Sequence, residues 1–358
     1  LTAVSVVFAR PVLELLQTPP EILDAAHSYI IIIFWGIGAA MLFNLLSNVI
    51  RALGDSRTPL YFLVLACVLN IALDLALILR FGMGPAGAAV ATVVSQLVSG
   101  LLCTIYVFRK FPMLRLTRAD WNMSRRYLWA HIRLALPMGF QASIIAIGAI
   151  LVQFALNRLG AQAVAAFSAA QKIDMVATLP MMSFGIAMAT YVAQNYGARN
   201  PLRIRQGVLQ CSLMSVGFSI AVAVVNIIWG PELIRLFVGT GEREVVRLAQ
   251  TYLNINASMY WVLALLFVFR YTLQGLGQSV VPTFAGVMEL AMRAFAAIIL
   301  ARYLGFAGAS MASPAAWIGS CVPLAIAYFF TRKRLAQSTK QPFPPCSGEE
   351  RESIRQAA

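Results

Sequence analysis

Long apolar stretches recur along the whole chain and constrain its fold more than any other sequence feature. The segment from Pro59 to Leu79 contains a single charged residue, Asp74, and the segment from Gly207 to Gly230 contains none. A helix needs about 20 such residues to cross the ~30 Å hydrocarbon core of a bilayer. Only 12% of the residues are charged, against about 25% in soluble domains. The sequence therefore predicts an all-α, polytopic membrane protein.

We expect about ten membrane-spanning helices, with predicted ranges 1–17, 28–53, 58–80, 84–108, 132–157, 163–197, 203–230, 250–274, 280–303 and 306–331. The basic residues gather in alternate connections, as the positive-inside rule requires. The predicted cytoplasmic set includes Arg51, Arg109, Arg203 and Arg270. The formal charge of +14 is thus explained by topology, and no nucleic-acid partner is expected. The C-terminus is predicted to lie in the cytoplasm, beneath the plasma membrane.

An internal repeat divides the chain. Residues 51–59 (RALGDSRTP) match residues 274–282 (QGLGQSVVP) at an offset of 223, and residues 84–88 match residues 305–309 at an offset of 221. Matched segments are predicted to face the same side of the membrane, which indicates a parallel repeat. The second copy is longer at its front by two helices, so we expect the chain to be N-terminally incomplete.

These boundaries predict four parts. They are the four remaining helices of an N-terminal bundle (1–108), a cytoplasmic linker (109–131), a six-helix C-terminal bundle (132–332) and a disordered polar tail (333–358). The cysteine and histidine spacings suit neither a zinc site nor a disulfide framework. We expect no metal or cofactor, and a monomer that contacts membrane lipid.

Several motifs, in order along the chain, resemble those of the multidrug and toxic compound extrusion (MATE) transporters. They are residues 51–59, Asn70 with Asp74, and residues 82–89, 165–174 and 192–199. The resemblance implies two six-helix bundles around a central cleft. It also implies export of small amphipathic or cationic substrates in exchange for protons or sodium, by alternating access. The first helix of the second bundle has Gln153 among its polar residues but no acid, so the coupling ion stays open.

Charged residues within the predicted spans are candidates for the ion or substrate pathway, because each costs about 2.5–3.5 kcal/mol at the bilayer centre. Asp74 shares a helix face with Asn70, which fits either an interhelical hydrogen bond or a cation site. Glu289 and Arg293 are spaced i,i+4 and suit either a structural ion pair or a place in the pathway.

Two further pairs remain open. Lys172 and Asp174 are two residues apart and diverge around their helix, so they are expected to contact different neighbours. Asn44 and Asn48 form a polar pair on one helix face, either structural or functional.

A secondary antiporter is the function that these features favour. The chain has no P-loop for ATP hydrolysis. The alternative is a flippase for lipid-linked precursors, which should line its cleft with several arginines and lysines. An intramembrane enzyme would need paired acids or a metal-binding set, which the helices lack. We therefore do not expect an enzyme.

Overall fold

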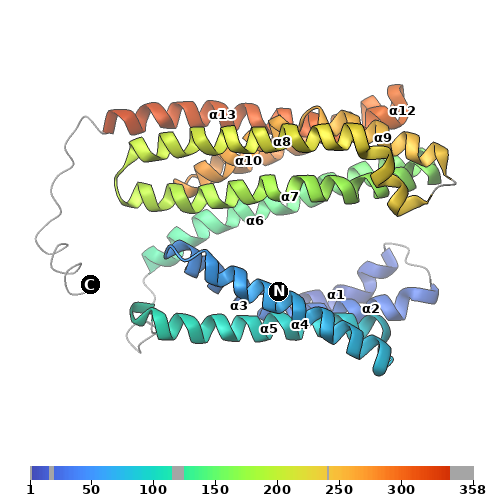
Figure 1. The fold of residues 1–358 in the computed structure, drawn as a ribbon, viewed down its shortest axis with the longest axis horizontal. Coiled ribbons are helices and arrows are strands. Elements are labelled where there is room, and N and C mark those ends of the chain that lie inside the picture. The colour runs from blue at the N-terminus through green and yellow to red at the C-terminus, as the bar shows by residue number, and fades with distance from the viewer. Residues whose placement is uncertain (1, 16–19, 115–124, 240–241, 339–358) are drawn as a thin grey trace, which may run out of the picture. The chain divides into compact units, whose positions relative to one another are not determined.

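The computed structural model describes residues 2–15, 20–114, 125–239 and 242–338. Within these ranges the chain is helical apart from short turns, and no strand occurs there. The helices form two compact units, which we call unit 1 (α1 to α5) and unit 2 (α6 to α13) (Figure 1). The prediction of an all-α protein is confirmed.

In unit 1, α5 is the element against which the others pack. The helices of this unit are α1 (Thr2–Leu15), α2 (Pro20–Trp35), α3 (Ile37–Ala52), α4 (Arg57–Leu75) with a π-helical segment at Ala76–Arg80, and α5 (Gly84–Lys110), followed by a 3₁₀ turn at Pro112–Leu114. The small residues Gly87, Ala89, Ala91 and Ser95 are buried on α5, which contacts α2, α3 and α4. Small side chains allow membrane helices to approach closely.

In unit 2, α10 lies at the centre of the packing. Its helices are α6 (Arg125–Arg158), α7 (Ala161–Gly197), α8 (Pro201–Val238), α9 (Arg243–Ala257), α10 (Tyr260–Gly275), α11 (Val280–Phe295) with a π-helical segment at Ala296–Leu300, α12 (Ala301–Ser310) and α13 (Ala312–Ser338). Helix α10 contacts α7, α8 and α13 and is buried along most of its length. Helices α7 and α8 run side by side from a short connection (Figure 1).

Most of the predicted spans are present, two of them as bent pairs. Seven described helical segments are long and apolar enough to cross a membrane, and the number rises to nine when each bent pair counts as one span. Helices α2 and α3 meet at 45°, and α9 and α10 meet at 50°. Predicted helices 28–53 and 250–274 are therefore wrong as single straight helices. At the first bend, a side chain on Gly36 would collide with Val93 of α5. Helix α1, described over 14 residues, is shorter than a typical span.

The duplication predicted from the sequence is confirmed in the backbone of each unit. Gly54 and Gly277 both have positive φ, at 93° and 76°, and Gly84 and Gly305 do so at 54° and 58°. The turns also share a hydrogen-bond pattern, because the N–H of Gly54 donates to Arg51 O at 3.0 Å. Correspondingly, the N–H of Gly277 donates to Gln274 O at 2.9 Å. Each copy also contains one bent pair and one π-helical segment.

Two boundaries differ from the predicted ones. Helix α6 begins at Arg125, inside the predicted linker, and α13 continues past Arg332 to Ser338. Arginine and lysine are good helix formers, and basic residues near a helix C-terminus interact favourably with its dipole. Residues 115–124 of the predicted linker and 339–358 of the predicted tail lie outside the described residues.

Replacing Gly277 with alanine should destabilise the protein by about 1–2 kcal/mol, because an L-residue is strained in the left-handed region. Gly217 is the matched control, since it lies inside α8 with open space around it. Alanine there should be neutral or stabilise the helix slightly. The thermal midpoint of the purified variants measures both effects. Equal midpoints for the two variants would contradict the positive-φ turn.

Candidate functional site

A buried ion cluster connects three helices of unit 2. Glu289 of α11 accepts a hydrogen bond from Arg270 of α10 at 2.6 Å and one from Arg293, on its own helix, at 3.1 Å. Arg270 also donates to the Ser320 hydroxyl of α13 at 3.0 Å. The three charged side chains are 7–11% exposed. Removing either partner of such a buried pair leaves a costly unpaired charge, so the cluster fixes α10 against α11.

Local sequence explains why the cluster fits. Glu289 lies on the buried face of α11 with Ala285 and Gly286. Gly148 of α6 faces the Arg293 side chain, and a Cβ at this position would lie 3.0 Å from Arg293 Cδ. The glycine therefore gives the guanidinium room between α6 and α11.

Arg270 is placed differently from its predicted position in a cytoplasmic connection. It is a buried residue within α10, 6% exposed. The count of basic residues by loop assigned Arg270 to the end of its helix. Helix α10 continues to Gly275, however, and Glu289 compensates the charge of Arg270. The i,i+4 spacing identified Arg293 as a partner of Glu289, whereas Arg270 comes from another helix and had no comparable signal.

Asp174 is a second acid within the spans of unit 2, with a different environment. The Tyr260 hydroxyl of α10 donates to Asp174 Oδ1 at 2.6 Å. Asn226 of α8 in turn donates to the Tyr260 hydroxyl at 3.2 Å. Within the described residues Asp174 has no ion-pair partner. The carboxyl group is thus oriented by a hydrogen-bond chain but not compensated by a fixed cation.

The Asp174 chain brings together residues that the sequence did not join. Tyr260 and Asn226 were not predicted as site residues. Asn226 carries a weak signal, because it is one of two amides in the mostly apolar stretch 207–230. Tyr260 carries none, because it lies 86 residues from Asp174 in the chain. The described contacts place Lys172 elsewhere, exposed and 5.5 Å from the Phe237 ring centroid.

In unit 1, Asp74 of α4 lies beside α5 with one carboxylate oxygen, Oδ1, buried and without a hydrogen-bond partner. Gln96 of α5 likewise has a buried Oε1 without a partner. Asn70 instead donates to Thr92 of α5, at a long 3.4 Å. Asn70 and Asp74 are therefore not held by a common partner in the described structure.

The remaining predicted residues make contacts within their own helices. Asn44 donates to Ala40 O at 2.8 Å, and the Asn48 amide oxygen accepts from Arg51 at 3.0 Å. Both asparagines are exposed on α3. Gln153 donates to Asn157 at 2.9 Å, on an exposed face of α6. No described contact joins these side chains to Asp74, Asp174 or Glu289.

The repeat-containing helical units, with long apolar helices and charges buried within their spans, define a polytopic membrane protein. A model of the MatE family matches residues 1–76 and 137–299. The chain is 33% identical over 269 residues to the probable multidrug resistance protein YpnP of Bacillus subtilis (strain 168), a match that covers 74% of this chain and 59% of that protein. It is 25% identical over 351 residues to an FAD transporter of Shewanella oneidensis, covering 95% and 75% of the two chains.

The fold agrees with a solved structure of a multidrug resistance MATE family transporter in an outward-facing conformation. The TM-score is 0.85 at 21% identity, and the match covers 94% of this chain and 75% of that one. The chain therefore belongs to the MatE family, the multidrug and toxic compound extrusion transporters, and is a multi-pass membrane protein.

Glu289→Gln should lower the free energy of unfolding by about 3–5 kcal/mol, because it leaves two buried arginines without a counter-charge. The exposed pair Glu244–Arg247 supplies the control, with N–O at 2.6 Å. Glu244→Gln should cost no more than about 1 kcal/mol. Denaturation of both variants in the same detergent measures the difference. Similar costs for the two variants would show that the buried cluster is not structural.

Proposed function

We propose that this protein is a secondary active antiporter that exports amphipathic or cationic compounds in exchange for protons or sodium by alternating access. The observation that carries the proposal is Asp174, an acid within a membrane span whose described contacts include the Tyr260 hydroxyl but no cation. Relatives named as multidrug resistance proteins support the same class of activity.

The two acids of unit 2 differ in what compensates their charge. Glu289 is bound by Arg270 and Arg293, so its negative charge is compensated permanently. Asp174 has only neutral hydrogen-bonding neighbours. A lone carboxylate in an apolar medium is strongly disfavoured. A proton or a sodium ion that binds and leaves Asp174 would compensate this charge, which is the property that ion coupling requires.

By the same reasoning, Asp74 is a second acid that a cation can bind and leave. Its Oδ1 is buried without a donor, and within the described residues it has no ion-pair partner. Each unit then contributes one acid that a transported cation can compensate. Of the acids within the spans, we assign Glu289 to packing and Asp74 and Asp174 to ion coupling.

Helix breaks support the alternating movement. Helices α2–α3 and α9–α10 are bent, and two π-helical segments interrupt the regular α-helix. Pro180 inside α7 removes one backbone hydrogen bond, which makes bending at that position easier. We place the protein in the plasma membrane as a monomer, with its C-terminus in the cytoplasm.

The flippase alternative is less well supported by the side-chain contacts. It calls for free basic groups that bind a pyrophosphate, yet Arg270 and Arg293 are both bound to Glu289, and Lys172 lies against Phe237. The proposal is therefore transport of small molecules rather than of lipid-linked precursors or chemistry on them.

Asp174→Asn should abolish ion-driven export when the protein is expressed and assayed in everted membrane vesicles. One charge crossing 100 mV is worth about 2.3 kcal/mol, so loss of one coupled charge removes about a fifty-fold substrate gradient. Ethidium accumulation under separate proton and sodium gradients measures this loss. Asp174→Glu should restore part of the activity, and Glu244→Gln should leave it unchanged. Full activity of the asparagine variant would refute the role of Asp174, and export that ignores both gradients would refute antiport.

Asp74→Asn should impair coupled export while leaving membrane insertion intact, because an amide is isosteric with the acid but cannot exchange a proton. The same vesicles report transport, and the amount of folded protein in them reports insertion. Normal export by this variant would assign Asp74 to helix packing.

A further inference from the structure

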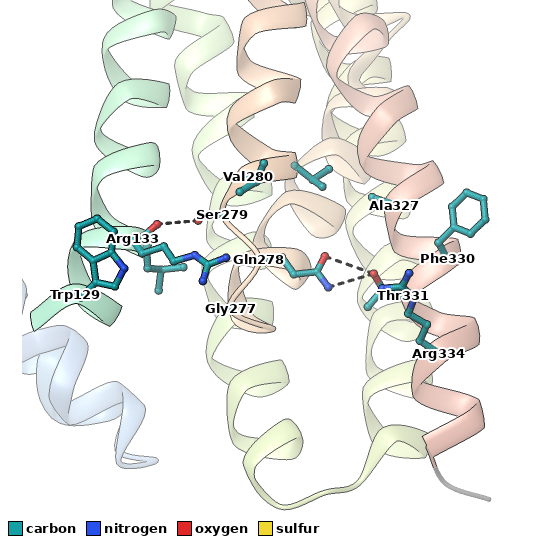
Figure 2. A pocket seen from close by; sticks show the side chains of 12 residues that line it. Trp129, Arg133, Gly277, Gln278, Ser279, Val280, Ala327, Phe330, Thr331 and Arg334 are labelled. Carbon is teal, nitrogen blue, oxygen red and sulfur yellow. Dashed lines mark hydrogen bonds between the residues drawn. The ribbon is translucent and has the colours of Figure 1, made fainter. Parts of the chain in front are cut away.

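A cavity of about 850 Å³ opens at one end of unit 2, between the start of α6, the turn before α11 and the end of α13 (Figure 2). Figure 2 shows Arg133 extending from α6 and Arg334 from α13, with the turn that contains Gln278 between them. Trp129 and Phe330 also line the cavity and are 65% and 64% exposed. The cavity thus combines two basic groups with two exposed aromatic rings.

At the repeat-related place in unit 1 the cavity is smaller, about 390 Å³, and polar side chains of the chain itself line it. Asp55 accepts hydrogen bonds from the Tyr106 hydroxyl at 2.6 Å and from Lys110 at 3.1 Å. It also accepts the backbone N–H groups of Arg57 and Thr58 at the start of α4. Hydrogen bonds from Tyr106 and from Thr58 hold the pKa of Asp55 well below its usual range, so it is ionised at neutral pH. In unit 1 the Asp55 carboxylate therefore accepts hydrogen bonds from both Lys110 and the N-terminus of α4.

The polar side chains at this place in unit 1 have uncharged or smaller counterparts in unit 2. The offsets of 223 and 221 residues that relate the two copies pair them as follows: Gln278 for Asp55, Ala327 for Tyr106 and Thr331 for Lys110. All three counterparts line the cavity. Gln278 and Thr331 keep a neutral hydrogen bond at 3.3 Å where unit 1 has its ion pair. The smaller side chains of Ala327 and Thr331 leave more open volume than Tyr106 and Lys110 do. Gln278 supplies no carboxylate where unit 1 has Asp55.

The charge around the cavity is therefore positive and uncompensated. Arg133 and Arg334 are exposed, and neither forms an ion pair within the described residues. No acid is among the described residues that line the cavity. Glu289 lies about 15 Å further along α11 and is already bound by Arg270. The first N–H groups of α11 also lack a side-chain cap from Ser279, whose hydroxyl donates to Arg133 O at 3.2 Å.

We propose that this cavity binds the headgroup of an anionic phospholipid, whose phosphate takes the charge-compensating place that Asp55 holds in unit 1. The cavity lies where the spanning segments of α6, α11 and α13 end, at the depth of lipid headgroups. Guanidinium groups bind phosphate through paired, charge-assisted hydrogen bonds. Aromatic side chains favour the interface, and basic pockets between membrane helices suit anionic headgroups. Trp129 and Phe330 would then contact the glycerol and the first part of the acyl chains.

The test titrates the purified full protein in a neutral detergent with dioctanoyl phosphatidylglycerol or dioctanoyl phosphatidylcholine and follows the thermal midpoint. The anionic lipid should raise the midpoint and the zwitterionic lipid should not. Each arginine near an anionic surface adds about five-fold in affinity, so the double variant Arg133→Gln/Arg334→Gln should bind about 25-fold more weakly. Arg302→Gln, which removes an exposed arginine at the start of α12, should bind normally.

A second variant tests the proposal without removing an arginine. Gln278→Asp installs the acid that unit 1 carries, so it should stabilise the protein without lipid and weaken its response to phosphatidylglycerol. Equal responses to the two lipids, or an equal loss in Arg302→Gln, would overturn the proposal. Inorganic phosphate that stabilises as much as the lipid at the same concentration would also overturn it. So would a lipid response that rises several-fold when Glu349, Glu350 and Glu352 of the tail become glutamine, because the tail would then be the occupant.

Discussion

The cost of holding charge away from water is the constraint on which the rest of this structure depends. In unit 2 it fixes the position of α10, because Arg270 on that helix must lie against Glu289 of α11. The same helix carries Tyr260, which orients Asp174 from α7. Helix α10 therefore contacts both acids. Its Arg270 compensates the charge of Glu289, whereas its Tyr260 orients Asp174 without compensating its charge. The first arrangement resists change, and the second leaves a carboxyl group without a fixed counter-charge.

Duplication explains much of the remaining architecture, and divergence between the copies explains where new sites arise. The glycine turns, bends and π-helical segments recur in both units, since they follow from backbone geometry that few residues allow. The charged and aromatic side chains around the turns do not recur. In unit 1, Asp55 is bound by Tyr106 and Lys110 beside a cavity of about 390 Å³, whereas the cavity of about 850 Å³ in unit 2 has arginines but no acid among its described lining residues. A retained backbone with replaced polar residues thus converts a structural ion pair into a place for an external anion.

Much of the fold could be predicted from the sequence, because apolar length and repeated glycine turns are local signals. The bends within predicted helices 28–53 and 250–274 were missed, since neither hydropathy nor length reports a change of direction. For the site, i,i+4 spacing identified Glu289 with Arg293, and the two-residue spacing separated Lys172 from Asp174. The sequence could not show which residues contact these acids from other helices, because such contacts depend on tertiary packing. These residues are Arg270, Tyr260 and Asn226.

The central claim is that Asp174 exchanges its compensating cation and Glu289 does not. Infrared difference spectroscopy of the reconstituted protein tests it most directly, by following carboxylic-acid and carboxylate bands as the proton and sodium concentrations change. The bands that respond should vanish in part in Asp174→Asn and persist in a Glu289→Gln variant that remains folded. Responsive bands that survive in Asp174→Asn and vanish in Glu289→Gln would contradict the claim.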